Sequence, residues 1–483
     1  MPTKAPVKLK KSLQKLRGMK DILPEDQKYW IYIRNKVEEI ANVYSYGRID
    51  MPILEDTSLF VRSVGKETDI VEKEMYTFED RGGDSISLRP EGTAGVVRAY
   101  IEHGMLNRPQ PVKLFYYGPF FRYDRPQAGR YRQFHQFGFE VIGENHPVVD
   151  AQLMMMSFNL YKELGLPVSL QVNSIGSVES REVYRKALLD YYRSRKNSLC
   201  EDCKKRMTKN TLRLLDCKEE DCKLLSQDAP QIIDYLDEDS NQHFVKVLEH
   251  LDSMEVPYVL NSRLVRGLDY YSGTVFEIWP DNTVEIEKTE EKNELVKTEE
   301  KKDDKKEEEN IESDHEDKKA KPGSQSALGG GGRYNQLVEA LGGQETPAMG
   351  FACGVERLVI ELKNRDIKVP GEQKPDLFVA QLGDEARKKS LKLFEDLRLL
   401  GFKIAENFSK DGLKNQMEQA NKKYAKYTII IGQKEILDGT ILIRDMENGI
   451  QETVDFDKII PELQKRLEKY GVKEKNEKKE KKL

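Results

Sequence analysis

Apolar residues recur at steps of three or four in the stretch PEDQKYWIYIRNKVEEIANVYSYGR, residues 24–48. Trp30, Ile33 and Val37 would share one face of a helix, and Pro24 stands where helices commonly begin. The next residues, IDMPILED, predict an extended segment, because Pro52 suits the edge or the start of a strand. The chain is therefore expected to open with an amphipathic helix that leads into a strand.

The rest of the pattern alternates between strand-like and helix-like stretches. Short β-rich runs, SISLRPE, VKLFYYGPFFRYD and RQFHQFGFEVIG, precede an expected helix near 148–164 and a mostly helical region from 177 to 255. The stretch LVRGLDYYSGTVFEIW then resumes β character. Between 375 and 470, apolar strands such as YTIIIGQ alternate with helical stretches such as EARKKSLKLFEDLRLLG. This last region predicts a separate α/β domain of about 100 residues.

A β-hairpin with a basic tip is predicted between residues 112 and 143. Residues 125–129, RPQAG, form a polar turn between two extended runs. On the return strand, the period of two puts Gln136 and Glu140 on one face and Phe137 and Phe139 on the other. One face is thus expected in the core, while the other carries an amide and a carboxylate near Arg122.

One stretch carries most of the net charge. The chain has 483 residues and a formal net charge of −5 at pH 7. Residues 285–321 hold 16 acidic residues and 10 lysines, a net charge of −6, with no aromatic residue. Removing them leaves +1, so the global charge says little about partners. Because this composition buries too little apolar surface to fold, we expect a disordered charged insert over 281–326.

Compartment and membrane association follow from composition. No run of about 18 apolar residues occurs and no signal segment opens the chain, so a cytoplasmic protein with no membrane partner is expected. The first 17 residues hold six Lys or Arg and no acidic residue, which we interpret as a solvated basic arm. Five cysteines, an odd number, fit a reducing compartment better than a disulfide framework.

Five segments, in one order, resemble the class II aminoacyl-tRNA synthetases and, within them, the histidyl-tRNA synthetase family. FFRYDRPQAGRYRQFHQFGFEVIG is similar to the arginine-bearing hairpin of that class, and GFACGVERLVI to the motif in which a helix start presents Arg357 to ATP. The first helix with RIDMPILED resembles the dimer-interface motif. LVRGLDYYSGTVFEI and GGGGRYNQL are similar to the two segments that distinguish the histidine-specific family.

The resemblance implies an α+β fold class. A class II catalytic domain, built on an antiparallel sheet with flanking helices, is expected over 17–374, interrupted by a helical insertion domain (177–255) and by the charged insert. A C-terminal α/β anticodon-binding domain is expected over 375–470. A basic arm (1–16) and a charged tail (471–483) complete the chain.

The implied activity is that of a histidine–tRNA ligase acting as a homodimer. L-histidine would react with ATP, accompanied by Mg²⁺, to give histidyl-adenylate and pyrophosphate, and histidine would then pass to the 3′ end of histidine tRNA. Negative charge grows on the α-phosphate, so positioning and cationic stabilisation dominate the catalysis. The resemblance assigns Arg122 and Arg266 to the α-phosphate and the substrate carboxylate, and Arg357 to the γ-phosphate.

Substrate selection is assigned in the same way. The resemblance gives the α-ammonium group to Glu91, Thr93 and Gln136 and the imidazole to Glu140, Tyr270, Tyr271 and Tyr334. It also counts Gly92 among the histidine-binding residues. Strand parity puts Arg266 and Tyr271 on opposite faces, so the chain must bend near Gly267 if both reach one pocket. Glycine runs are most often flexible connections, so GGGG is informative only through the RYN that follows it.

Contacts with tRNA are expected at two places. Arg125 and Gln127, at the hairpin tip, could read base edges or phosphates of the acceptor end. The C-terminal domain resembles an anticodon-binding module, although its own residues show only a small α/β domain. Two alternatives stay open: a non-catalytic regulatory paralogue serving histidine biosynthesis, and an RNA-binding protein with a vestigial catalytic fold. The intact arginine and carboxylate set favours the enzyme.

Four cysteines fall within one lysine-rich stretch, CEDCKKRMTKNTLRLLDCKEEDC. Cys200 and Cys203 have a spacing typical of thiolate zinc sites, whereas the spacing of Cys217 and Cys222 is less typical. Free cysteines are also readily buried as small apolar residues, and the resemblance requires no metal here. We therefore assign no metal ligand from the sequence and leave Zn²⁺ at this cluster open. A zinc site would be expected to order this small domain and leave histidine activation intact.

Overall fold

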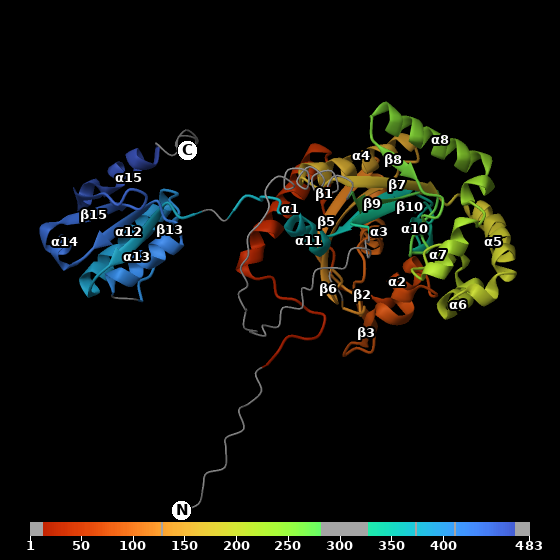
Figure 1. Ribbon diagram of the computed structural model, residues 1–483, viewed down its shortest axis with the longest axis horizontal. Coiled ribbons are helices and arrows are strands. Elements are labelled where there is room, and N and C mark those ends of the chain that lie inside the picture. The colour runs from red at the N-terminus through yellow and green to blue at the C-terminus, as the bar shows by residue number, and fades with distance from the viewer. Residues whose placement is uncertain (1–12, 127–128, 282–326, 372–373, 410–411, 469–483) are drawn as a thin grey trace, which may run out of the picture. The chain divides into compact units, whose positions relative to one another are not determined.

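The computed structural model describes residues 13–126, 129–281, 327–371, 374–409 and 412–468 (Figure 1). Most of the basic arm, Gln127, nearly all of the expected insert and the expected tail lie outside these residues. The chain forms two compact units, Met1–Pro370 and Gly371–Leu483. Among the described helices, none is long and apolar enough to cross a membrane.

The first unit is built on an eight-stranded sheet with the order β1-β5-β6-β11-β10-β9-β7-β8. Neighbouring strands are antiparallel except for β1 with β5 and β7 with β8, which are parallel. In sheet order, the strands are Gly47–Arg48, Val112–Phe121, Gln133–Ile142, Ala348–Gly354, Gly329–Arg333, Thr274–Pro280, Val168–Ser174 and Tyr258–Leu260.

One face of this sheet is covered by four helices that share a core with it. They are α1 (Pro24–Val43), α4 (Pro147–Glu163), α8 (Glu238–Ser253) and α11 (Val355–Asn364). The helix predicted at the N-terminus is confirmed, and its Ile33, Val37 and Ile40 are buried in this core. Phe137 and Phe139 of β6 face the same core, so the alternation predicted for the hairpin is correct.

The opposite face supports smaller elements, including a three-stranded sheet with the order β2-β4-β3. These elements are β2 (Leu54–Asp56), β3 (Tyr76–Glu79), β4 (Ser85–Leu88), α2 (Thr57–Val64), α3 (Thr93–Glu102) and α10 (Leu337–Ala340). A short π-helical segment, Ile70–Glu74, lies between α2 and β3. Tyr100 of α3 and Tyr334, just after β10, belong to the core on this side.

The helical region predicted over 177–255 is present but packs in two places. Helices α5 (Val178–Arg193), α6 (Glu201–Lys209) and α7 (Glu220–Gln227) contribute to the second core, together with short 3-10 turns. Helix α8 instead packs on α4, through Phe244, Val247 and Leu251. The insertion region is therefore α5 to α7, and α8 completes the main sheet's cover.

The second unit is a five-stranded sheet, β13-β12-β14-β15-β16, with helices that bury both of its faces. Its strands are β12 (Leu377–Gln381), β13 (Ile404–Glu406), β14 (Tyr427–Ile431), β15 (Thr440–Asp445) and β16 (Gln451–Asp455). Its helices are α12 (Asp384–Leu399), α13 (Leu413–Lys422), α14 (Gln433–Asp438) and α15 (Ile459–Glu468). The alternation of strands and helices predicted for this region is confirmed.

Two sequence interpretations were wrong. LVRGLDYY, expected as β structure, is a loop, and β9 begins only at Thr274. The GGGG run, expected as a flexible connection, forms β10 inside the sheet, paired with β9 and β11. Glycine is needed there because a Cβ on Gly331 would lie 2.0 Å from the carbonyl oxygen of Gly350. The close approach of two backbones thus overrides the poor strand propensity of glycine.

Candidate functional site

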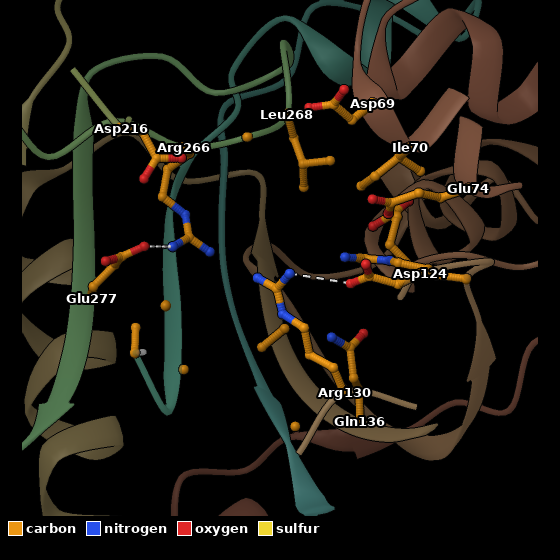
Figure 2. Close-up of a pocket in the computed structure, with 18 of the residues that line it drawn as sticks. Asp69, Ile70, Glu74, Asp124, Arg130, Gln136, Asp216, Arg266, Leu268 and Glu277 are labelled. Atoms are coloured by element: carbon orange, nitrogen blue, oxygen red, sulfur yellow. Dashed lines mark hydrogen bonds and ion pairs between the residues drawn. The ribbon is translucent and has the colours of Figure 1, made fainter. Parts of the chain in front are cut away.

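A cavity of about 740 Å³ lies over the central strands of the first unit. Its walls come from segments far apart in sequence: the π-helical segment, the hairpin loop between β5 and β6, the loop before β9, and the α6–α7 segment. Figure 2 shows acidic and basic side chains facing one another across it, with Glu74 and Asp124 on one side and Arg266 on the other.

The structure brings together most of the site residues that were predicted from the sequence. Those that line the cavity are Glu91, Gly92, Thr93, Arg122, Gln136, Arg266, Tyr270, Tyr271, Tyr334 and Arg357. Glu140 lies directly beneath them, bonded to two of the lining side chains. Arg125 is exposed on the hairpin loop and does not line the cavity, and Gln127 lies outside the described residues.

Glu140 is a fully buried carboxyl group held from two sides. Tyr334 Oη donates to its Oε2 at 2.6 Å, and Thr93 Oγ1 donates to its Oε1 at 2.8 Å. Burial raises the pKa of Glu140 to about 8, although the two hydroxyl donors act in the opposite direction. The carboxyl fits only because residue 350 is glycine: a Cβ there would lie 1.7 Å from Glu140 Oε2. The group therefore has a fixed position and a proton affinity suited to neutral pH.

Glu91 serves the helix that follows it as well as the cavity. Its two carboxylate oxygens accept the backbone N–H groups of Thr93 and Ala94 at 2.7 and 2.8 Å, at the start of α3. Burial raises the pKa of this carboxyl. Because each oxygen has a second lone pair, Glu91 can still accept a hydrogen bond from a ligand. The sequence reading assigned Glu91 only to substrate and missed its role at the helix start.

Three guanidinium groups line the cavity near the hairpin. Arg122 Nε donates to the carbonyl oxygen of Pro90 at 2.8 Å, and Arg130 pairs with Asp124 at 3.2 Å (Figure 2). Arg357, in the first turn of α11, donates to the carbonyl oxygen of Ala327 at 2.6 Å. Burial, together with the positive charge of Arg130, lowers the pKa of Arg357. Arg122 and Arg357 each keep further N–H donors besides the one given to a carbonyl oxygen, so this wall can bind an anionic ligand.

Arg266 and Tyr271 both reach the cavity, through a turn of the loop at residues 267–271. The Arg266 guanidinium pairs with Glu277 of β9 (Figure 2), and its Cζ lies 5.6 Å from the centroid of the Tyr271 ring. A Cβ on Gly330 would lie 2.6 Å from Arg266 Nη1, so this glycine makes room for the guanidinium. The bend that strand parity demanded near Gly267 is therefore present, within a loop and not a strand.

Three tyrosine rings close one end of the cavity. The rings of Tyr270 and Tyr271 have centroids 4.7 Å apart, and Tyr270 meets Tyr334 edge to face at 5.7 Å. All three side chains are buried. Aromatic walls with hydroxyl groups, grouped near a buried carboxyl, suit a small planar ring that carries its own N–H donors.

Several residues that line the cavity were not predicted from the sequence. Glu277 could have been recognised as a charged residue inside the apolar run TVFEIW, and Arg130 as a member of the basic hairpin. Arg213 and Lys218, from the segment between α6 and α7, carried no local signal. Only the packing of the insertion region against the sheet places them here.

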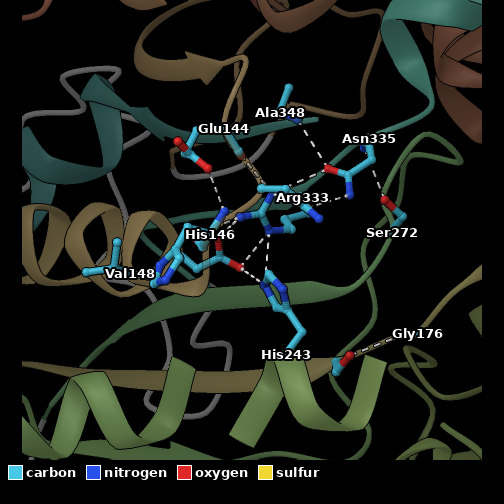
Figure 3. Close-up of polar contacts among 12 residues, drawn as sticks. Glu144, His146, Val148, Gly176, His243, Ser272, Arg333, Asn335 and Ala348 are labelled. Carbon is cyan, nitrogen blue, oxygen red and sulfur yellow. Dashed lines mark hydrogen bonds and ion pairs between the residues drawn. The ribbon is translucent and has the colours of Figure 1, made fainter. Parts of the chain in front are cut away.

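Arg333, which precedes Tyr334, is buried in a polar network outside the cavity (Figure 3). Its Nη2 and Nε contact the two carboxylate oxygens of Asp150 at 2.5 and 2.8 Å. His243 Nε2 lies 3.0 Å from the same carboxylate. Arg333 also donates to the carbonyl oxygens of Glu144 and His146. This network fixes the end of β10 against α4 and α8 and so positions Tyr334.

The arrangement combines a small polar subsite with a cationic wall. The buried carboxyls and tyrosines can orient a compact ligand with hydrogen-bond donors, while the arginines can bind phosphate or carboxylate oxygens bidentately. The hydroxyl groups of Thr93 and Tyr334 both donate to Glu140 and so hold this carboxyl in place. The chemistry that fits is therefore group transfer by positioning and charge stabilisation.

Comparison with known proteins identifies relatives over nearly the whole chain. The family described as histidyl-tRNA synthetase matches residues 18–286, and the anticodon-binding domain family matches residues 376–466. Histidine–tRNA ligase of Dehalococcoides mccartyi is 46% identical over 94% of this chain and 100% of its own length. The same-named protein of Pelotomaculum thermopropionicum is 44% identical over 93% of this chain and 97% of its own length.

Solved structures give the same picture. Apo histidyl-tRNA synthetase of S. aureus superimposes with a TM-score of 0.72 at 37% identity, covering 94% of this chain and all of that one. A protein of Bacillus halodurans, described as an ATP phosphoribosyltransferase regulatory subunit/histidyl-tRNA synthetase, has a TM-score of 0.56 at 20% identity, covering 88% of this chain and 98% of its own. That second likeness shows a shared fold only.

Proposed function

Because the chain belongs to the histidyl-tRNA synthetase family, we propose that it is an ATP-dependent histidine–tRNA ligase. It activates L-histidine to histidyl-adenylate with release of pyrophosphate, and then transfers histidine to the 3′ end of histidine tRNA. The observation that carries the proposal is the Glu140 carboxyl, fixed by Tyr334 and Thr93 beneath an arginine-lined cavity.

The imidazole of histidine would occupy the tyrosine end of the cavity. Its ring nitrogens require one fixed partner that accepts a hydrogen bond, and Glu140 offers a carboxyl that exchanges a proton near neutral pH. Tyr270, Tyr271 and Tyr334 would enclose the ring. Larger amino acids would collide with these buried aromatic side chains, while smaller ones would provide no ring N–H group for the Glu140 carboxyl.

The charged ends of the reactants would lie toward the arginines. Glu91, Thr93 and Gln136 would bind the α-ammonium group, beside Gly92, where a Cβ would lie 2.4 Å from the Tyr116 ring. Arg122 and Arg266 would hold the histidine carboxylate and the α-phosphate, and Arg357 the γ-phosphate of ATP, which enters as its Mg²⁺ complex. Arg122 and Arg266 thereby stabilise the charge that develops as the carboxylate oxygen attacks phosphorus.

Three finer points belong to the proposal. Arg125, exposed on the hairpin loop, and Gln127 would contact the acceptor end of the tRNA, and the second unit would bind the anticodon. The active form would be a homodimer, measurable by light scattering after size-exclusion chromatography. Its place of action would be the cytoplasm, where the cysteines stay reduced.

Pyrophosphate exchange into ATP tests the proposal. With Mg²⁺ present, histidine alone among the standard amino acids should support exchange, and histidine tRNA should then be charged. Exchange driven by another amino acid would overturn the specificity. No exchange with any amino acid, in a protein that is folded by circular dichroism, would favour the non-catalytic regulatory or RNA-binding alternatives.

A further inference from the structure

The four cysteines of the insertion region converge on one point. The Sγ atoms of Cys200, Cys203, Cys217 and Cys222 all lie within 4.8 Å of one another. Cys200 precedes α6, Cys203 is in its first turn, and Cys222 is in the first turn of α7. The fifth cysteine, Cys353, lies apart on β11, where its Sγ accepts a hydrogen bond from Tyr161 Oη.

The spacing of the sulfur atoms fits a metal-bound tetrathiolate. Four sulfurs about 2.3 Å from a zinc ion at tetrahedral angles are about 3.8 Å apart. Cys200 Sγ and Cys217 Sγ lie 3.8 Å apart, so this edge of the tetrahedron is already formed. A disulfide bond would require about 2.05 Å.

Backbone N–H groups point to the sulfur atoms of the cluster. The N–H group of Cys203 points to Cys200 Sγ at 3.4 Å, and that of Cys200 points to Cys222 Sγ at 3.3 Å. Cys200 caps the N-terminal end of α6, and Cys222 lies in the first turn of α7. Cysteines buried only as apolar residues have no need of such donors.

Charge in the same segment offsets part of that of a bound tetrathiolate. A divalent zinc ion with four thiolates carries a net charge of −2, and residues 200–223 hold seven basic and six acidic side chains, a formal net charge of +1. Three of the four cysteines are buried, so a metal there would be shielded from water.

We propose that Cys200, Cys203, Cys217 and Cys222 bind one Zn²⁺ ion. The ion holds residues 200–222, called the zinc segment here, as one wall of the cavity. The metal is structural, because all four of its positions are filled by protein sulfurs and none stays open for a substrate. Binding of the ion does not depend on the proposed function.

The zinc segment is connected to the cavity by direct contacts. Cys200 and Cys217 themselves line it. Asn210 donates to Asp269 at 3.1 Å, in the loop that carries Arg266 and Tyr271, and Arg213 lies 3.9 Å from Asp69 beside the π-helical segment. The sequence predicts that a zinc site would leave histidine activation intact, on the premise that the pocket residues lie away from the four cysteines. Because these contacts join the cysteine cluster to the cavity, we instead expect loss of the metal to disturb the cavity.

Metal analysis of the full-length protein, purified without a histidine tag or added zinc, tests the site. We expect about one zinc per chain, and titration with a mercurial should release that zinc as four thiols react. Replacing zinc by Co²⁺ should give the intense visible bands of tetrahedral cobalt with a sulfur-to-cobalt charge-transfer band. Less than about 0.2 zinc per chain, or iron in its place, would overturn the proposal.

Matched variants locate the ion. Cys200→Ser and Cys217→Ser should lose zinc, whereas Cys353→Ser should retain it because that thiol lies on β11. Equal zinc content in all three would place the metal elsewhere. If the first two variants fail to fold, the cobalt spectrum and thiol count of the unaltered protein decide the matter.

The wall function has its own readout. Removing zinc with a chelator should lower histidine-dependent exchange by roughly tenfold or more, the scale seen when groups supporting a site are lost, and added Zn²⁺ should restore it. Full exchange in the zinc-free protein would overturn the role in the cavity while leaving the metal site in place. No exchange before or after stripping would instead count against the proposed function.

Discussion

The hydroxyl of Tyr334 donates a 2.6 Å hydrogen bond to Oε2 of Glu140, linking the residue after β10 to the C-terminal part of β6. Both side chains are buried, and β11 lies between their two strands in the sheet. The contact therefore passes over the neighbouring strand, where Gly350 leaves the space for the carboxyl group. The histidine-binding end of the proposed site depends on this bridge.

Tyr334→Phe should weaken both the fold and histidine binding. The change leaves a buried carboxyl oxygen without its donor, which costs about 1–3 kcal/mol. Both tryptophans, Trp30 and Trp279, lie in the first unit, so denaturant unfolding followed by their fluorescence reports on that unit. The KM for histidine should rise, with a smaller change in the KM for ATP.

Tyr192→Phe is the matched control. Tyr192 is also fully buried, but its hydroxyl has no hydrogen-bond partner among the described residues. This variant should be as stable as the unaltered protein and should bind histidine normally. If the two variants behave alike, the hydrogen bond to Glu140 contributes nothing of its own.

Glu140→Gln should change how stability depends on pH. The pKa of this carboxyl is raised from 4.5 to about 8 in the folded chain. Its contribution to stability is therefore fully present below about pH 4.5 and is lost as the pH rises through 8. One pKa unit corresponds to about 1.4 kcal/mol, so the loss is on the order of a few kcal/mol.

Glutamine cannot ionise, so its variant should gain stability relative to the unaltered protein between pH 5 and 8, then level off above about 8. Urea unfolding curves collected across this range measure the difference. A constant difference at every pH would mean that Glu140 does not titrate in this window. Histidine binding should be weakened at all pH values, because a neutral amide cannot form an ion pair with an imidazolium group as a carboxylate can.

Arg266→Ala should separate catalysis from folding. Loss of a preorganised positive charge at the transition state should lower pyrophosphate exchange by roughly 10²-fold or more. The melting temperature should change little, because Glu277 keeps its hydrogen bond from Trp279 Nε1 at 3.1 Å. Arg193→Ala, which removes an exposed guanidinium from α5, should leave both quantities unchanged. A large fall in melting temperature with Arg266→Ala alone would make the residue structural.

How far the sequence could predict this site is clear from β6 and the loop before β9. Strict alternation put Glu140 and Phe139 on opposite faces, and the structure agrees. The loop from Leu264 to Tyr271 could not be recognised as a loop from the sequence. Its apolar residues are buried, so they give the same apolar pattern as the residues of a strand. What makes it a loop is the pairing of β9 with β7, which begins only at Thr274, a contact far apart in sequence.

Long-range packing also explains the other errors. The role of the GGGG run depends on Arg266 and the backbone of β11, and no local pattern shows either. Arg333 stands beside Tyr334 in the segment GGGGRYNQL, yet its guanidinium turns away from the cavity to Asp150 and His243. Neighbours in a strand point to opposite faces, so one is structural and the other lines the site.

Asp150→Asn should strongly destabilise the first unit. Burial alone would raise the pKa of Asp150, but Arg333 and His243 hold it below its usual value. Removing the negative charge leaves the buried Arg333 uncompensated, which costs about 3–5 kcal/mol. The carboxylate stabilises the fold above its unfolded pKa of about 4, and this is lost as the pH falls through its lower folded pKa. The penalty of the variant should therefore shrink in acid.

Asp190→Asn is the comparison, since it breaks an exposed ion pair with Arg193. Surface pairs contribute at most about 1 kcal/mol, so this variant should unfold almost at the same urea concentration as the unaltered protein. Similar small losses in both variants would show that the Arg333 network is not a stabilising element.

The charged insert expected over 281–326 joins two strands that pair directly. Ile278 of β9 lies opposite Gly329 of β10, so the two ends of the connection are held by the sheet itself. The entropy of closing a loop rises only logarithmically with its length, so deleting residues 285–321 should raise stability by about 1 kcal/mol at most. Replacing them with an equally long Gly/Ser segment keeps the length and removes the charge, and it should leave stability unchanged. Both proteins should retain full exchange and tRNA charging, because β10 and Gly330 stay in place. Normal charging in the Gly/Ser replacement but not in the deletion would show that the length of the connection matters, and loss in both would assign a function to its charged residues.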